Sequence, residues 1–256
     1  MQSKRSRLDR FISRHIQIPK KQVRLLLAQG RVKVDGVIAR DIDLQIDQFN
    51  HIICDGLVLQ QRQARYIMLN KPVGVVCATK DDKHRTVIDL INEAVNDAPN
   101  SNQSNSESSN TDDLHIVGRL DLNTSGLVLL TNDSQWSKGI MSPDSKVDKI
   151  YVVTLKNPID ERYIQAFEEG FYFAYEDITT LPAKLEIISS HCALVTLQEG
   201  RYHQIKRMFG RFRNPVIGLH RLSVGDIRLD ESLLPGQSRQ LTATEMMSVG
   251  GIPGNN

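Results

Sequence analysis

One aspartate in the sequence stands where a side chain could be presented to a substrate. Asp121 belongs to a polar loop, residues 119–126, between a short apolar segment that ends at Val117 and the apolar run 127–131. A run of that length is too short for a helix and is typical of a strand buried on both faces. A loop between two buried strands holds a charged side chain rigidly. The alternative is that Asp121 only forms a turn by binding nearby backbone N–H groups.

Two further segments carry groups that could act together with a carboxylate. Tyr151 places an aromatic ring at the start of a strand expected over 149–155. The segment 199–210, EGRYHQIKRMFG, contains a glycine that permits a sharp entry into a helix expected over 202–212. That helix and its end are strongly basic through Lys206, Arg207, Arg211 and Arg213. The plainer interpretations are a tyrosine in the core and a basic helix that binds phosphate or faces solvent.

Several common catalytic patterns are absent from the sequence. It has no GxxxxGK[ST] phosphate loop, no GxGxxG after a strand, no HExxH and no GxSxG. Its seven histidines have no ligand spacing, which argues against a metal enzyme. Its three cysteines are far apart, which indicates a reducing compartment. No run approaches the roughly 20 apolar residues of a membrane span, and the N-terminal segment lacks a signal-like apolar core, so a cytoplasmic protein is expected.

Positive charge is concentrated at the N-terminal end. Residues 1–40 hold eleven Lys or Arg and two acidic residues, whereas the net charge of the whole chain is only +2. A basic segment on a mildly acidic body is typical of a protein that meets a polyanion, although a solvated helix face is the alternative. The expected contacts are Arg7, Arg10, Arg14, Lys20, Lys21, Arg24 and Arg31.

Apolar spacing and turn signals divide this basic segment into short elements. Helical spacing covers residues 8–15 and the segment between Pro19 and Gly30, and Asp35-Gly36 predicts a hairpin over 31–38. Residues 55–65 look like a linker. We therefore expect a small polyanion-binding domain over 1–60 and a larger domain over 61–256, which the resemblance described below identifies as an S4-like RNA-binding domain and a catalytic domain.

The larger segment contains more strands than helices. Strands are expected at 66–69 and 73–78, followed by a helix capped by Thr86. Residues 96–113 are low in complexity and are expected to be a disordered insertion. After this insertion, the expected helices are too few for regular βαβ crossovers. This indicates an α+β fold with a mixed, largely antiparallel sheet.

Taken together and in this order, the segments resemble the pseudouridine synthases, and within them the RsuA branch that modifies small-subunit ribosomal RNA. The resemblance covers nearly the whole chain apart from 96–113. It rests on an S4-like N-terminal region over residues 5–50 and on NKPVG, GRLDLNTSGLVLLTND, QWS, KIYVVTL, EGRYHQIKRM and PGQSRQLT. Large-subunit relatives tend to carry an arginine-rich third motif, so GRYHQIKRM favours the small-subunit branch.

The resemblance implies a role for each candidate site residue. Asp121 would be the essential carboxylate, either attacking the sugar carbon or removing a sugar proton, and Lys206 would be its cationic partner. Tyr151 would stack on the flipped uracil. Arg119, Ile205 and Arg207 would bind the substrate, and His203 is left as a structural residue or an RNA contact.

The resemblance also implies a reaction without a cofactor or metal, because uridine is only rearranged. The expected partner is 16S ribosomal RNA or a small-subunit assembly intermediate, with uridine 516 as the target and a monomer as the active form. The alternatives are a 23S ribosomal RNA pseudouridine synthase and a non-catalytic RNA-binding assembly factor.

Overall fold

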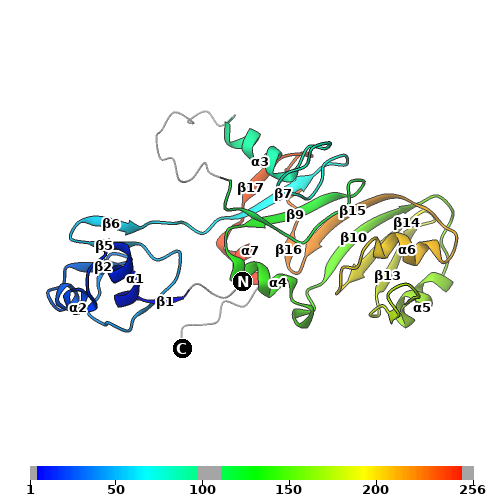
Figure 1. Cartoon of the computed structure of the whole chain (residues 1–256). Coiled ribbons are helices and arrows are strands. Elements are labelled where there is room, and N and C mark those ends of the chain that lie inside the picture. The colour runs from blue at the N-terminus through cyan, green and yellow to red at the C-terminus, as the bar shows by residue number, and fades with distance from the viewer. Residues whose placement is uncertain (1–4, 97–110, 250–256) are drawn as a thin grey trace. The chain divides into compact units, whose positions relative to one another are not determined.

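The computed structural model describes residues 5–96 and 111–249 (Figure 1). The chain divides into two compact units, one ending at Ala64 and the other beginning at Arg65. The insertion expected at 96–113 lies almost wholly outside the described residues. No helix in the described ranges has the length and apolar character needed to cross a bilayer.

The N-terminal unit packs two helices against a small antiparallel sheet of order β3-β2-β5-β6, with a separate β1–β4 pair (Figure 1). The expected helical spacing is confirmed, because Leu8, Ile12, Val23 and Leu27 are all buried in its core. The elements are β1 (Ser6–Arg7), α1 (Leu8–His15), α2 (Lys20–Ala28), β2 (Val32–Val34), β3 (Val37–Ile38), β4 (Gln45–Ile46), β5 (Ile52–Cys54) and β6 (Leu57–Gln60).

Two Asp-Gly turns of the same kind connect strands of this unit. Asp35-Gly36 joins β2 to β3 as expected, with positive φ at both residues. Asp55-Gly56 has the same conformation and joins β5 to β6. The expectation of a linker over 55–65 was therefore wrong for its first half. Asp-Gly with apolar flanks is a hairpin signal in both places.

The second unit is built on a nine-stranded sheet with the path β13-β14-β10-β15-β9-β7-β17, to which β8 and β16 add at β9 and β15. Its strand pairs are antiparallel except for β9 with β15, which confirms an α+β fold with a mixed, largely antiparallel sheet. The strands are β7 (Tyr66–Lys71), β8 (His115–Val117), β9 (Ser125–Thr131), β10 (Lys149–Leu155), β13 (Lys184–Ser189), β14 (Cys192–Leu197), β15 (Val216–Val224), β16 (Ile227–Arg228) and β17 (Ser238–Gln240).

Residues 73–78 do not form the expected strand. Only an isolated parallel bridge joins Val76 to Thr86 there. Thr86 does cap the following helix, since its hydroxyl accepts from Asp89 N–H at 3.1 Å. A short hairpin of β11 (Tyr172–Phe173) and β12 (Ile178–Thr179) stands apart from the large sheet. The helices of this unit are α3 (Val87–Asn96), α4 (Ser134–Met141), the 3-10 turn η1 (Pro143–Ser145), α5 (Arg162–Glu169), α6 (Gln204–Gly210) and α7 (Ala243–Ser248).

Strand β9 is the centre of this unit because both of its faces are buried. Val128 and Leu130 belong to one apolar cluster, together with residues of α3, α5 and α6. Leu127 and Leu129 belong to a second cluster, together with Trp136 of α4. Complete burial of such a side chain contributes about 1.5–3 kcal/mol. A strand held from both sides gives the loop that precedes it a rigid base.

Candidate active site

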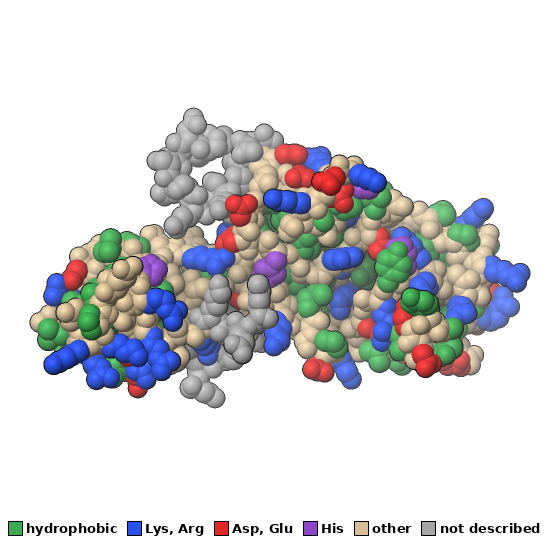
Figure 2. All heavy atoms as spheres, in the orientation of Figure 1, with side chains coloured by type: hydrophobic (Ala, Val, Ile, Leu, Met, Phe, Trp, Pro, Cys, Tyr) green, Lys and Arg blue, Asp and Glu red, His purple; other side chains and the backbone are tan. Residues whose placement is uncertain are grey.

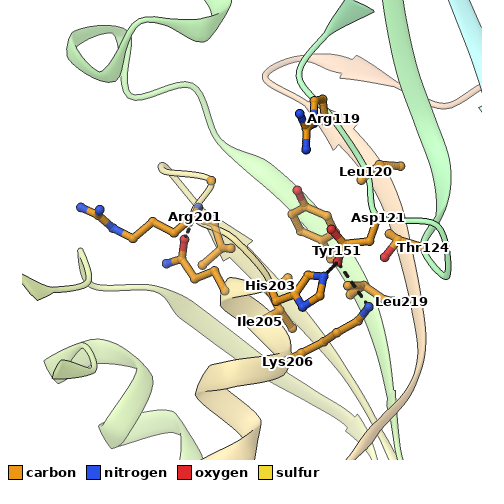
Figure 3. A pocket seen from close by; sticks show the side chains of 13 residues that line it. Arg119, Leu120, Asp121, Thr124, Tyr151, Arg201, His203, Ile205, Lys206 and Leu219 are labelled. Atoms are coloured by element: carbon orange, nitrogen blue, oxygen red, sulfur yellow. Dashed lines mark hydrogen bonds and ion pairs between the residues drawn. The ribbon is translucent and has the colours of Figure 1, made fainter. Parts of the chain in front are cut away.

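Asp121 lies in the loop between β8 and β9, two paired strands of the sheet. The loop backbone forms a turn, because Thr124 N–H donates to the Asp121 carbonyl oxygen at 3.0 Å. The side chain does not serve that turn. Its carboxylate oxygen Oδ2 faces Lys206 and His203 of the α6 segment instead (Figure 3). The alternative in which the Asp121 side chain forms the turn is therefore not seen: the backbone forms the turn, and the carboxylate is presented to α6.

The buried ammonium group of Lys71 binds the backbone of this loop. Lys71 is completely inaccessible to solvent. Its Nζ donates to the carbonyl oxygens of Thr124 at 2.7 Å, Pro72 at 2.9 Å and Leu122 at 3.5 Å. Burial lowers the pKa of Lys71, against a smaller opposing effect from Cys77 and Asp121. These contacts fix the backbone of the loop that carries Asp121.

The end of the loop is fixed by a close backbone approach. Gly126 has φ +106°, and a Cβ at this position would collide with the backbone of Arg221. Only glycine adopts this conformation without strain. Arg221 is itself buried, and its Nε donates to the Leu127 carbonyl oxygen at 2.8 Å. The parallel pairing of β9 with β15 therefore determines where the loop ends and the strand begins.

The Asp121 carboxylate has two nitrogen-bearing neighbours. Lys206 Nζ is 3.3 Å and His203 Nε2 is 3.4 Å from the same oxygen, Oδ2. Oδ1 accepts no hydrogen bond from the described residues. The Asp121 and Lys206 side chains are about one-third exposed, and such a pair contributes at most about 1 kcal/mol to folding. Its main consequence is for the site, because it holds the carboxylate next to an ammonium group.

These groups line a small pocket of about 90 Å³. Tyr151 lines it from β10, beside a bulge in the pairing with β15, and Ile205 lines it from α6. Both side chains are over nine-tenths buried, so the charged centre has an apolar wall. Arg201 is a lining residue whose side chain points away from Asp121 (Figure 3). The lining residues are Arg119, Leu120, Asp121, Thr124, Tyr151, Leu197, Gly200, Arg201, His203, Gln204, Ile205, Lys206 and Leu219.

His203 is the site residue to which the sequence assigned no specific role. Its backbone is left-handed, with φ +49°, immediately before α6. Its ring stacks on Tyr202 with centroids 3.9 Å apart and an interplanar angle of 18°. The available signal was its spacing, since residues 203 and 206 are three apart and fall on one side of a helix start.

Arg207 does not face the pocket. Its guanidinium forms a bidentate pair with Glu176, at 2.6 and 2.7 Å, and lies 3.6 Å over the Phe173 ring. Both partners belong to the β11–β12 hairpin segment. The expectation that Arg207 binds the substrate in the pocket has no geometric support. The other expected residues, Arg119, Asp121, Tyr151, Ile205 and Lys206, are brought together there.

The seven basic residues of the N-terminal unit fall into two groups. Arg7 pairs with Asp9 and Asp43, and Arg31 pairs with Asp55. Basic side chains gather on the face of this unit that Figure 2 shows. The other five are exposed and form no ion pair within the part of the chain that the structure describes: Arg10, Arg14, Lys20, Lys21 and Arg24.

The described residues contain no group of three or more His, Cys, Asp or Glu side chains placed to hold a metal ion. The buried side-chain atoms without a hydrogen-bond partner among the described residues include Arg221 Nη2 and the Thr124 hydroxyl oxygen. Neither is a metal ligand. The chemistry that the pocket offers is that of a carboxylate, an ammonium group, an imidazole and a phenol ring.

Comparison with known proteins agrees with this geometry. Residues 65–210 match the family model described as RNA pseudouridylate synthase. Relatives called ribosomal small subunit pseudouridine synthase A are 47% identical in Pseudomonas aeruginosa and 40% identical in Escherichia coli, each over 95% of this chain and 99–100% of theirs. A crystal structure of a pseudouridylate synthase, 40% identical, covers 94% of this chain and 98% of its own with a TM-score of 0.63. The chain therefore belongs to the RNA pseudouridylate synthase family and is an isomerase of uridine in RNA.

Proposed function

We propose that this enzyme converts one uridine of 16S ribosomal RNA, uridine 516, into pseudouridine, with Asp121 as the essential carboxylate. The relatives named for the small ribosomal subunit support the choice of RNA. The observation that carries the chemical part is the position of the Asp121 carboxylate, held at the pocket mouth by Lys206 and His203. The active form is a cytoplasmic monomer.

The reaction breaks the C1′–N1 bond, turns the detached uracil and joins C1′ to C5. An ionised carboxylate assists this either by attacking the electron-poor sugar carbon or by removing a sugar proton. Both routes need Asp121 without its proton, and the ammonium group of Lys206 lies 3.3 Å from its carboxylate. Because Lys206 and His203 both contact Oδ2, the other oxygen, Oδ1, is the one that we assign to the sugar.

The apolar wall of the pocket suits a base that has left the RNA stack. Tyr151 and Ile205 provide a ring and an aliphatic surface next to the carboxylate. Stacking on an aromatic side chain contributes about 1–3 kcal/mol per base. The uracil must stay bound while it turns, and this contact holds it without fixing one orientation. In this proposal the Tyr151 phenol also handles the C5 proton.

The N-terminal unit grips the RNA backbone as an S4-like domain in this proposal. Five exposed basic residues on α1 and α2, which form no ion pair with the described residues, supply the charge. Phosphate contacts position a protein on RNA but do not read its sequence. Choice of the target uridine therefore depends on the second unit and on the shape of the RNA.

Mapping pseudouridine in ribosomal RNA from cells with and without the gene tests the substrate. Loss at position 516 of 16S RNA, restored by the wild-type gene, is the expected result. Loss in 23S RNA would assign the enzyme to the large subunit. An unchanged map would leave only a non-catalytic role in ribosome assembly.

Asp121→Asn tests the carboxylate in the same cells and with purified protein. We expect turnover to fall at least ~10³-fold while RNA affinity changes little, because general acid–base and nucleophilic roles depend on the charge. Asp144→Asn, an exposed aspartate in the 3-10 turn, is the matched control and should behave as wild type. Turnover of Asp121→Asn near the wild-type rate would exclude the assigned role.

A further inference from the structure

We propose that Tyr202 and Tyr175 form a stacking surface for unpaired nucleotides that flank the target uridine. The inference rests on the proposed function, because it assigns RNA as the ligand. Tyr175 is 97% exposed and Tyr202 is 72% exposed. Burying a tyrosine ring is favourable, so two rings left in solvent beside an active site indicate a surface that a ligand covers.

The Tyr202 ring lies one side chain further from the Asp121 carboxylate than the His203 ring does. His203 contacts Asp121, and the His203 ring in turn stacks on Tyr202 at a centroid distance of 3.9 Å. One face of the tyrosine is therefore occupied by the imidazole, whereas most of the ring remains exposed. A base stacked on the open side would continue the column that begins beside Asp121. A flipped uridine leaves its neighbours unstacked on one side, and such a ring replaces the lost partner.

Arg207 connects Tyr202 to the hairpin that carries Tyr175. Its Nη1 donates to Glu176 Oε1 at 2.6 Å and to the Tyr202 carbonyl oxygen at 3.4 Å. Glu176 directly follows Tyr175, so one guanidinium group holds both tyrosine segments near each other. The pairing also explains why Arg207 is absent from the pocket.

The hairpin itself is held in place by further contacts. The Tyr172 hydroxyl donates to Asp177 at 2.8 Å across the turn, and Arg211 donates to the Tyr172 carbonyl oxygen. The Arg207 guanidinium also covers the Phe173 ring. These contacts fix both ends of the four-residue connection that presents Tyr175. A fixed aromatic ring loses little entropy when a base stacks on it.

The surrounding charge suits RNA. Figure 2 shows basic and hydrophobic side chains side by side on the surface over α6. Two acidic groups of these segments are already paired with arginines, Glu176 with Arg207 and Glu199 with Arg201 at 2.8 Å. Exposed rings interleaved with Arg and Lys are the usual combination for binding single-stranded nucleic acid. The basic residues are Arg201, Lys206, Arg207, Arg211 and Arg213.

The test uses the full-length enzyme and a short single-stranded RNA of the target sequence, with 2-aminopurine on either side of the uridine. Tyr202→Leu and Tyr175→Leu keep an apolar side chain but remove the ring, whereas Tyr202→Phe and Tyr175→Phe keep the ring. Each Leu variant should weaken RNA binding about 5- to 100-fold and raise KM more than it lowers kcat. Each Phe variant should restore binding.

Fluorescence gives an independent readout of stacking. Wild type and the Phe variants should quench 2-aminopurine on binding, and the Leu variants should lose that quenching at RNA saturation. Leu234→Ala changes another exposed apolar residue and serves as the control, with wild-type affinity expected. Leu variants with wild-type affinity and quenching would overturn the stacking surface. A wild type that binds this RNA but forms no pseudouridine in any ribosomal RNA would overturn the proposed function alone.

Discussion

Lys71 Nζ lies 2.7 Å from the carbonyl oxygen of Thr124, so a fully buried ammonium group is bound to the loop that presents Asp121. Replacing Lys71 with Met removes the donor and leaves buried carbonyl oxygens unpaired. We expect the free energy of unfolding to fall by about 2–3 kcal/mol, measured by urea denaturation. Lys138→Met, at an exposed position, should change it by less than about 0.5 kcal/mol. Equal stabilities for the two variants would contradict this role.

The Lys71→Met variant also tests how the free energy of unfolding depends on pH. Burial holds the pKa of Lys71 below its usual 10.5, so the unfolded chain binds this proton more tightly than the folded protein does. Stability contributed at this position therefore increases as pH rises from the lowered folded-state pKa towards 10.5 and is constant below that window. The difference in unfolding free energy between wild type and Lys71→Met should grow with pH in alkaline buffers. A difference that shrinks with pH would have the wrong sign.

Lys206 should affect catalysis through its charge. Lys206→Met removes the cation 3.3 Å from Asp121, and we expect kcat to fall about 10- to 100-fold. Lys206→Arg keeps the charge and should recover most of the activity, although its geometry differs. The alternative role is phosphate binding. In that case, Lys206→Met would lower the slope of log Kd against log salt and leave kcat unchanged.

The two groups of basic residues in the N-terminal unit should differ in their effect on RNA binding. Each phosphate contact contributes about 0.7–0.9 to the salt slope, so Gln at position 10, 14, 20, 21 or 24 should reduce the slope by about that amount. Arg7→Gln and Arg31→Gln should have smaller effects, because their guanidinium groups are already paired with aspartates. The slope is measured from RNA titrations at several salt concentrations. Equal effects at all seven positions would contradict the division.

Acid stability should depend on Arg239. Hydrogen bonds from Arg239 lower the pKa of Glu245 to about 2, against a smaller effect of burial. A carboxylate with a lowered pKa stabilises the fold above its unfolded-state value, and this contribution is lost as pH falls through the folded-state value. Arg239→Gln should therefore be less stable than wild type at pH 6, and the gap should close between about pH 4.5 and pH 2. A constant gap would exclude the linkage.

Much of the second unit could be predicted because its strands have clear patterns. The run 127–131 was expected to be buried on both faces, and its alternate residues do belong to different apolar clusters. The parallel pairing of β9 with β15 was not predictable in the same way. The two strands are nearly a hundred residues apart, and local pattern carries no information about which distant strand becomes the neighbour.

The site residues show the same limit. Asp121, Tyr151 and Lys206 could be selected by type and order, and the structure brings them into one pocket. Arg207 follows Lys206 directly, but consecutive helical residues point in different directions, and its partner Glu176 belongs to a distant hairpin. His203 reaches Asp121 only because its backbone is left-handed, a conformation that its sequence neighbours do not signal.

The parallel pairing of β9 with β15 also has a consequence for protein synthesis. The loop with Asp121 is anchored to Arg221, so about a hundred residues must be translated after the aspartate before the pocket can form. The N-terminal unit ends at Ala64 and has its own core. Domains fold as units during translation, N-terminal first. In a nascent chain, the basic N-terminal unit is therefore folded well before the active site can form.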